Sequence, residues 1–185
     1  MALEATFRLL FVQIRKLCDT LNAILLTVGD KPTNRGAVLA DELENTILDM
    51  LGLAEDARTA ARTAEKAVAS SIDLDRARRA LAKCQENFHQ VERQFSNELV
   101  SYQKLNQLAS LANERGGEWK AWAGSMKDAI EQGRQPIEET SKALAACWQE
   151  LVEHSGTTSI SVTTTGQKII ARSTLTDEAI RERTT

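Results

Sequence analysis

From Leu3 to Val28, apolar residues recur in alternating steps of four and three without a break. A mean spacing of about 3.5 residues keeps the apolar stripe on one side of a helix, and it is typical of helices that pack almost parallel to one another. A second stripe at Phe11, Cys18 and Leu25 widens this face. A broad apolar face fits the core of a helical bundle better than a two-stranded coiled coil. The first helix should end at Gly29 and Pro32, because proline blocks continuation of the helix.

The same spacing predicts three more long helices, over about residues 33–70, 73–115 and 118–155. In the third, we expect the apolar seam to continue through Tyr102 and Leu105, with one extra step of four after Phe95. In the fourth, Gly133 and Pro136 predict a kink or a short break. Short connections require neighbouring helices to fold back antiparallel. The fold expected for residues 1–155 is therefore all-α, an elongated antiparallel up-down four-helix bundle with heptad-patterned helices.

Residues 156–185 form a C-terminal tail of a different character, in which Ile, Val and Thr replace the helix formers. The apolar positions are Ile160, Val162, Ile169 and Ile170, with a Thr165-Gly166 turn signal between the pairs. This pattern predicts a flexible or β-like segment, a strand or a hairpin. A lone hairpin of this size is marginal in water. The tail therefore pairs with a partner or another copy of the chain, stays disordered in isolation, or packs on its own bundle. We interpret it as a docking element.

Bulk charge and hydropathy exclude several functional classes. Net charge is −3, so the chain lacks the basic bias typical of nucleic-acid binding. No apolar run approaches the roughly 18 residues of a membrane span, and the N-terminal residues lack a secretory basic region. Cysteines at 18, 84 and 147 are odd in number and widely spaced, which favours reduced thiols in a cytoplasmic compartment. Neither nucleic acid nor a membrane is the expected partner.

No constellation of residues indicates catalysis or metal binding. A di-iron bundle needs Glu-x-x-His on two helices, but only Glu86 and His89 fit, because His154 has Leu151 three places before it. No Gly-x-Ser-x-Gly nucleophile elbow and no phosphate-binding loop is present in the sequence. We therefore predict no cofactor, no metal and no enzymatic activity.

Two groups of surface candidates remain. Residues 41–56 contain six acids and no base, whereas residues 58–83 carry seven bases and three acids. We call the cations of the second stretch that share helix faces the basic tip: Arg58, Arg62, Lys66, Arg76, Arg79 and Lys83. The basic tip either meets an acidic protein, a phosphate-rich polymer or anionic lipid, or is an ordinary solvated surface. Trp119 and Trp122 either pack in the core or form a partly exposed interface anchor.

Trp122-Ala123-Gly124, between two helical segments, resembles the Trp-x-Gly signature of the small helical-hairpin proteins exported by ESX-type secretion systems. The resemblance covers about residues 73–155. In that family the motif lies in the turn, whereas here it falls inside the fourth predicted helix, and the trailing Tyr-x-x-x-Asp/Glu export signal is absent.

The function expected from these observations is a non-catalytic protein–protein interaction module: an adaptor, scaffold or subunit of a larger cytosolic assembly. Its partners are other proteins or further copies of itself as a homo-oligomer. The alternative is a secreted or membrane-active helical protein, such as an ESX-like secretion substrate or a pore-forming component. The apolar stretches LLFVQI and AILLTV of the first helix favour that alternative.

Overall fold

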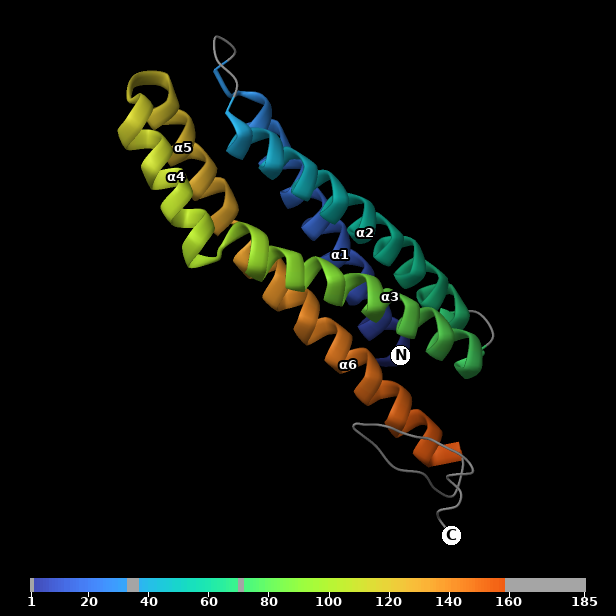
Figure 1. Cartoon of the computed structure of the whole chain (residues 1–185). Helices are drawn as coiled ribbons and strands as arrows, with labels where there is room; N and C mark the ends of the chain where they lie inside the picture. Colours follow the sequence, from blue (N-terminus) through green and yellow to red (C-terminus); the bar gives the residue numbers. More distant parts are fainter. Residues whose placement is uncertain (1, 33–36, 70–71, 159–185) are drawn as a thin grey trace.

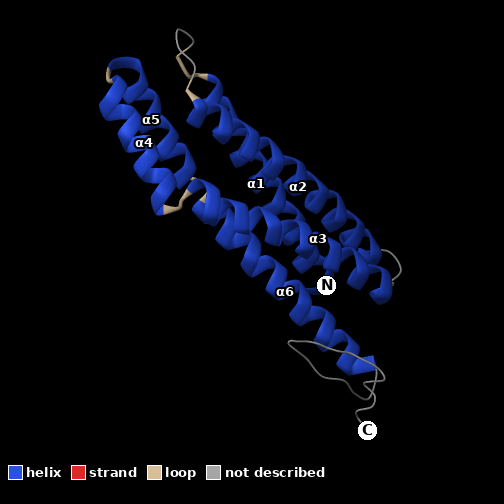
Figure 2. Cartoon of the chain, in the orientation of Figure 1, coloured by secondary structure: helices blue, strands red, loops and turns tan. Residues whose placement is uncertain are grey.

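The computed structural model describes residues 2–32, 37–69 and 72–158, and every regular element within them is helical (Figures 1 and 2). The elements in chain order are α1 (Ala2–Gly29), α2 (Val38–Ala69), α3 (Leu74–Gln94), the π-helical segment η1 (Phe95–Leu99), α4 (Tyr102–Arg115), α5 (Gly117–Glu131) and α6 (Arg134–Thr158). The prediction of an all-α fold is confirmed. The tail residues Ile160, Val162, Ile169 and Ile170 lie outside the described residues.

Helix α1 lies at the centre of the core. All eight residues of its predicted seam, from Leu3 to Val28, are buried, and Cys18 of the second stripe is buried with them. This helix packs against α2, α5 and α6. Because three neighbours surround it, a face wider than a coiled-coil seam is required, as the second stripe predicts.

Helices α2 and α3 form the most extensive helix–helix contact in the structure. The C-terminal half of α2 presents mainly alanines to the core, including Ala54, Ala57, Ala61 and Ala64. Small side chains let neighbouring helices approach closely, and α3 fills the space with Leu81 and Phe88. Helix α3 begins at Asp73, whose carboxylate accepts a hydrogen bond from the backbone N–H of Arg76 at 3.0 Å.

The prediction of one continuous third helix is wrong. The chain leaves the α-helix at Phe95, forms η1, and restarts at Ser101, whose extended backbone (φ −65°, ψ 151°) and hydroxyl cap α4. A π-helical turn holds one more residue than an α-helical turn, and so shifts the apolar stripe around the helix. Tyr102, expected in the core, is consequently 82% exposed, and the buried face resumes at Leu108 and Leu111.

The predicted interruption of the last helix is present as a short break between α5 and α6. Pro136 has no N–H to donate to the carbonyl of Gln132, so the α-helical ladder stops there. Gly133, which follows Gln132 in the chain, is buried, and a Cβ built on it would lie 2.7 Å from Cε1 of Phe95. The two interruptions therefore touch each other, one on each side of the α4–α5 hairpin.

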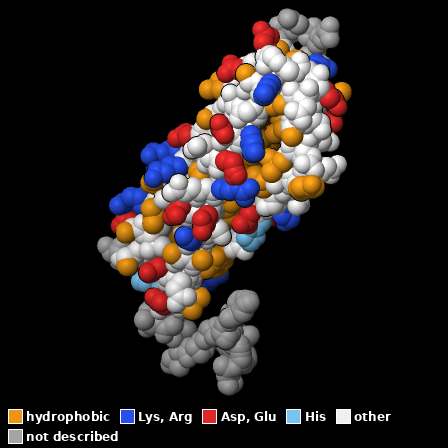
Figure 3. Space-filling view, turned by 90° about the vertical axis from the view of Figure 1, so that its left-hand side faces the viewer, with side chains coloured by type: hydrophobic (Ala, Val, Ile, Leu, Met, Phe, Trp, Pro, Cys, Tyr) orange, Lys and Arg blue, Asp and Glu red, His pale blue; other side chains and the backbone are white. Residues whose placement is uncertain are grey.

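Helices α4 and α5 form that hairpin, joined at Gly116 and Gly117. Both glycines have positive φ (61° and 48°), a conformation that other residues adopt at a cost. The hairpin lies at the end of the molecule where α1 ends and α2 begins (Figure 1). On the face that carries it, acidic and basic side chains are interspersed, with hydrophobic side chains visible between them (Figure 3).

Candidate functional site

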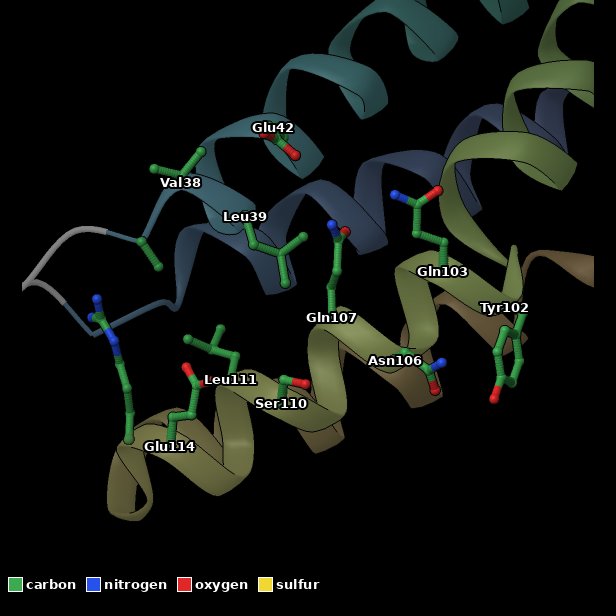
Figure 4. Close-up of a pocket in the computed structure, with 12 residues that line it drawn as sticks. Val38, Leu39, Glu42, Tyr102, Gln103, Asn106, Gln107, Ser110, Leu111 and Glu114 are labelled. Carbon is green, nitrogen blue, oxygen red and sulfur yellow. The ribbon is translucent and has the colours of Figure 1, made fainter.

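A groove of about 670 Å³ lies between the start of α2 and the length of α4. Helix α3 packs against both α2 and α6, whereas α4, which follows it, packs against α5. The shift introduced by η1 and Ser101 thus leaves one side of α4 facing the groove. Figure 4 shows Leu39 pointing from α2 towards α4, and Gln107 and Leu111 pointing from α4 towards α2.

The α4 wall of the groove is a complete helix face. Its residues follow i, i+3 and i+4 spacing over nearly the whole helix: Tyr102, Gln103, Asn106, Gln107, Ser110, Leu111, Glu114 and Arg115. At 1.5 Å per residue this face is about 20 Å long. All of these side chains except Leu111 are exposed. The opposite wall contributes Ala37, Val38, Leu39 and Glu42.

The polarity of the α4 face explains why α4 does not close onto α2. Closure would bury the amides of Gln103, Asn106 and Gln107 against an apolar surface that includes Leu39. An amide buried without a hydrogen-bond partner costs about 1–3 kcal/mol. An occupant with polar and apolar side chains satisfies both walls, whereas direct contact between α2 and α4 does not.

One ion pair crosses the groove. Nζ of Lys104 on α4 lies 3.5 Å from Oε1 of Glu42 on α2. The Glu42 side chain is half exposed, so solvent screens this pair and its contribution is below about 1 kcal/mol. Elsewhere the groove carries both signs of charge, because Glu114 and Arg115 both line the far end of α4. Residues 41–56 of α2 contain six acids and no base, and Nζ of Lys31 lies 3.7 Å from Asp41 and 3.2 Å from Glu44. The charges that line the groove are therefore mixed, and the acidic surface lies beside the groove along α2.

Trp119 and Trp122 lie on α5 and are buried, with 7% and 4% of their surface exposed. Their rings stack edge to face at 5.5 Å, and Nε1 of Trp122 donates a hydrogen bond to the carbonyl oxygen of Thr27 at 3.1 Å. The expectation of a partly exposed anchor is therefore wrong, because both indoles fill the contact between α5 and its neighbours. The Trp-x-Gly motif accordingly lies inside a helix, not in a turn.

The basic tip divides between α2, which carries Arg58, Arg62 and Lys66, and α3, which carries Arg76, Arg79 and Lys83. Arg62 makes contacts within the protein: its guanidinium lies 3.9 Å from the centre of the Phe11 ring and 3.8 Å from Glu65. Among the described residues, the side chains of the other five show no ion pair. They form a solvated basic surface at the end of α2 away from the groove.

Chemically reactive groups are scarce. Burial raises the pKa of Cys18 to about 11 and of Cys84 to about 12, and it raises the pKa of Cys147 as well. Thiols with such values are protonated near neutral pH and poor nucleophiles. No cluster of three or more His, Cys, Asp or Glu within the described ranges is arranged to hold a metal ion. None of the described helices is long and apolar enough to cross a membrane.

Sequence reasoning missed the groove. Its α4 wall reads as an ordinary solvated helix face, and Leu39 and Leu111 read as routine core positions. One signal was present: the seam of the third predicted helix takes one extra step of four after Phe95, where η1 begins.

Comparisons with protein-family models, with curated proteins and with solved structures each find no match to this chain.

Proposed function

We propose that this chain is a non-catalytic protein–protein interaction module, an adaptor, scaffold or subunit of a cytosolic assembly, that binds one amphipathic helix of a protein partner in the groove between α2 and α4. The observation that carries the proposal is the uncovered face of α4. Its length of about 20 Å corresponds to about 14 residues of helix. Leu111 on α4 and Leu39 on the opposite wall offer apolar contacts to a helix whose anchors follow i, i+3, i+4 spacing.

Charge supports a basic partner helix. The α2 wall opens onto the acidic stretch 41–56, which contains no base, whereas Glu114 and Arg115 offset each other at the far end of α4. A partner helix with Lys or Arg beside its apolar stripe complements this surface, and an acidic helix is repelled.

For residues 1–155 we propose an elongated up-down four-helix bundle, in which each of the four columns is either one helix or helices that follow one another end to end. Helices α1 and α2 each form one column, and the other two are interrupted at η1 and at Gly133. The tail remains a proposed second docking element, for a protein partner or for another copy of the chain.

The test uses two synthetic amphipathic helices of about 14 residues with the same apolar pattern, one carrying Lys and the other Glu. Fluorescence anisotropy measures their binding to the full-length protein. We expect the basic peptide to bind and the acidic peptide not to bind. Gln107→Arg, which adds a cation inside the groove, should weaken binding by roughly ten-fold.

The matched control is Thr59→Arg, which adds the same charge to an exposed position of α2 outside the groove. Equal weakening by both substitutions would show general charge attraction instead of groove binding, and would contradict the proposal. The secreted or membrane-active alternative requires the protein to bind liposomes at high salt, which flotation of vesicles detects.

A further inference from the structure

The α4–α5 hairpin joins the rest of the molecule through two junctions that lack α-helical geometry. On one side η1 is followed by Val100 (φ −103°, ψ 9°) and the extended Ser101. On the other side the turn at Gln132 and Gly133 separates α5 from α6. The approach of Gly133 to the Phe95 ring places both junctions at the same level of the bundle. Hinges consist of a few such residues at element ends, which absorb changes in φ and ψ.

The two helices of the hairpin are held unequally. Helix α5 is seated on α1, with Met126 and Ile130 fully buried and the Trp122 indole bonded to Thr27. Helix α4 packs on α5 and reaches α2 through the Lys104–Glu42 pair, in which the Glu42 side chain is half exposed. The edge of the hairpin that borders the groove is therefore its weakly held edge.

We propose that the α4–α5 hairpin is a hinged arm, which rolls on α1 about α5 and so moves α4 towards or away from α2. The motion sets the width of the groove, and closure clamps an occupant between α2 and α4. Only the clamping rests on the proposed function. The motion itself belongs to the free protein, in which it varies the width of the groove without bringing the α4 amides against α2, and a ligand would select the narrower form.

A modest rotation is enough. The axes of packed helices lie about 8–10 Å apart, so a roll of about 30° about α5 displaces α4, and Asn113 with it, by about 5 Å. Such a displacement changes the groove by half the diameter of a helix. The Phe95–Gly133 contact lies at the end of α5, close to the axis of the roll, where displacement is smallest.

Distances between pairs of spin labels test the motion in the free full-length protein. Labels are attached to cysteines introduced at exposed positions, and the three native thiols are buried and resist labelling. The arm-to-bundle pair is Asn45→Cys on α2 with Asn113→Cys on α4. Two reference pairs are Asn113→Cys with Ser125→Cys inside the arm, and Thr59→Cys with Ala82→Cys between α2 and α3. Circular dichroism verifies that each labelled variant is folded.

We expect narrow distributions for both reference pairs and an arm-to-bundle distribution that is broader by about 5 Å. In the arm-to-bundle pair, Glu42→Gln should raise the ratio of long-distance to short-distance populations by up to about five-fold. Asp49→Asn, which neutralises an exposed acid of α2 outside the groove, should leave it unchanged.

An arm-to-bundle distribution as narrow as the reference pairs would overturn the hinge, and so would a broad distribution inside the arm. The outcome is separate from that of the peptide experiment. A mobile arm without peptide binding contradicts the proposed function alone, whereas peptide binding by a rigid arm contradicts the hinge alone.

Discussion

Among the described glycines, Gly133 leaves the least room for a side chain. Its φ is not positive, so other residues can adopt its backbone conformation. What excludes them is space, since a Cβ would lie 2.7 Å from Phe95 and 3.2 Å from the carbonyl oxygen of Ile130. By contrast, Gly52 in α2 has open space where its Cβ would be. Two glycines of one chain therefore respond to the same substitution in opposite ways.

We predict that Gly133→Ala lowers the free energy of unfolding by about 1–3 kcal/mol, because the added methyl group must displace the Phe95 ring. Gly52→Ala should raise it by about 0.5–1 kcal/mol through helix propensity alone. Urea denaturation of both variants measures the difference. In the double variant Gly133→Ala with Phe95→Leu, part of the loss should be recovered. A stabilising Gly133→Ala would show that the two junctions are not in contact.

At the scale of the element, the sequence predicted α1 well and the third helix poorly. Every residue of the α1 seam is buried, because an uninterrupted helix obeys one period throughout its length. A π-helical turn changes that period locally, yet an apolar residue lies at a plausible spacing on either side of it. Tyr102 thus looked like a seam residue, and the groove that results from its displacement could not be predicted from spacing.

The seating of α5 on α1 depends on the Trp122 indole, which provides both packing and a hydrogen bond to Thr27. Trp122→Phe removes the donor and leaves the backbone carbonyl of Thr27 without it. We predict a loss of about 1 kcal/mol in the free energy of unfolding beyond the loss caused by Trp119→Phe. The second variant is the control, because Trp119 is similarly buried on the same helix. Equal losses in urea denaturation would assign the role of Trp122 to packing alone.

At the scale of the whole molecule, the three thiols make the free energy of unfolding vary with pH in the alkaline range. They lie in the core on α1, α3 and α6. Folding raises the pKa of Cys18 from 9.0 to about 11 and of Cys84 from 9.0 to about 12. The folded state therefore holds its thiol protons above the pH at which the unfolded chain releases them. The contribution of these thiols to the free energy of unfolding is fully present below about pH 9, and it is lost as the pH rises towards 11 to 12.

We predict that the free energy of unfolding falls above about pH 9 by up to about 1.4 kcal/mol per pH unit for each thiol. Urea denaturation at a series of pH values measures the slope. Cys84→Ala should show a shallower slope than the unmodified protein, and an unchanged slope would contradict the assignment. In the folded protein near neutral pH, a thiol reagent should modify none of the three cysteines until denaturant is added.

The contact between Phe95 and Gly133 also brings together the points where the chain leaves the bundle and returns to it. A segment whose two ends adjoin can be lengthened, shortened or exchanged without moving what it is attached to. Residues 101–132 therefore have the form of an insertion whose two ends lie side by side. Residues added at the Gly116-Gly117 turn would lengthen this hairpin while the packing of α1, α2, α3 and α6 stays the same.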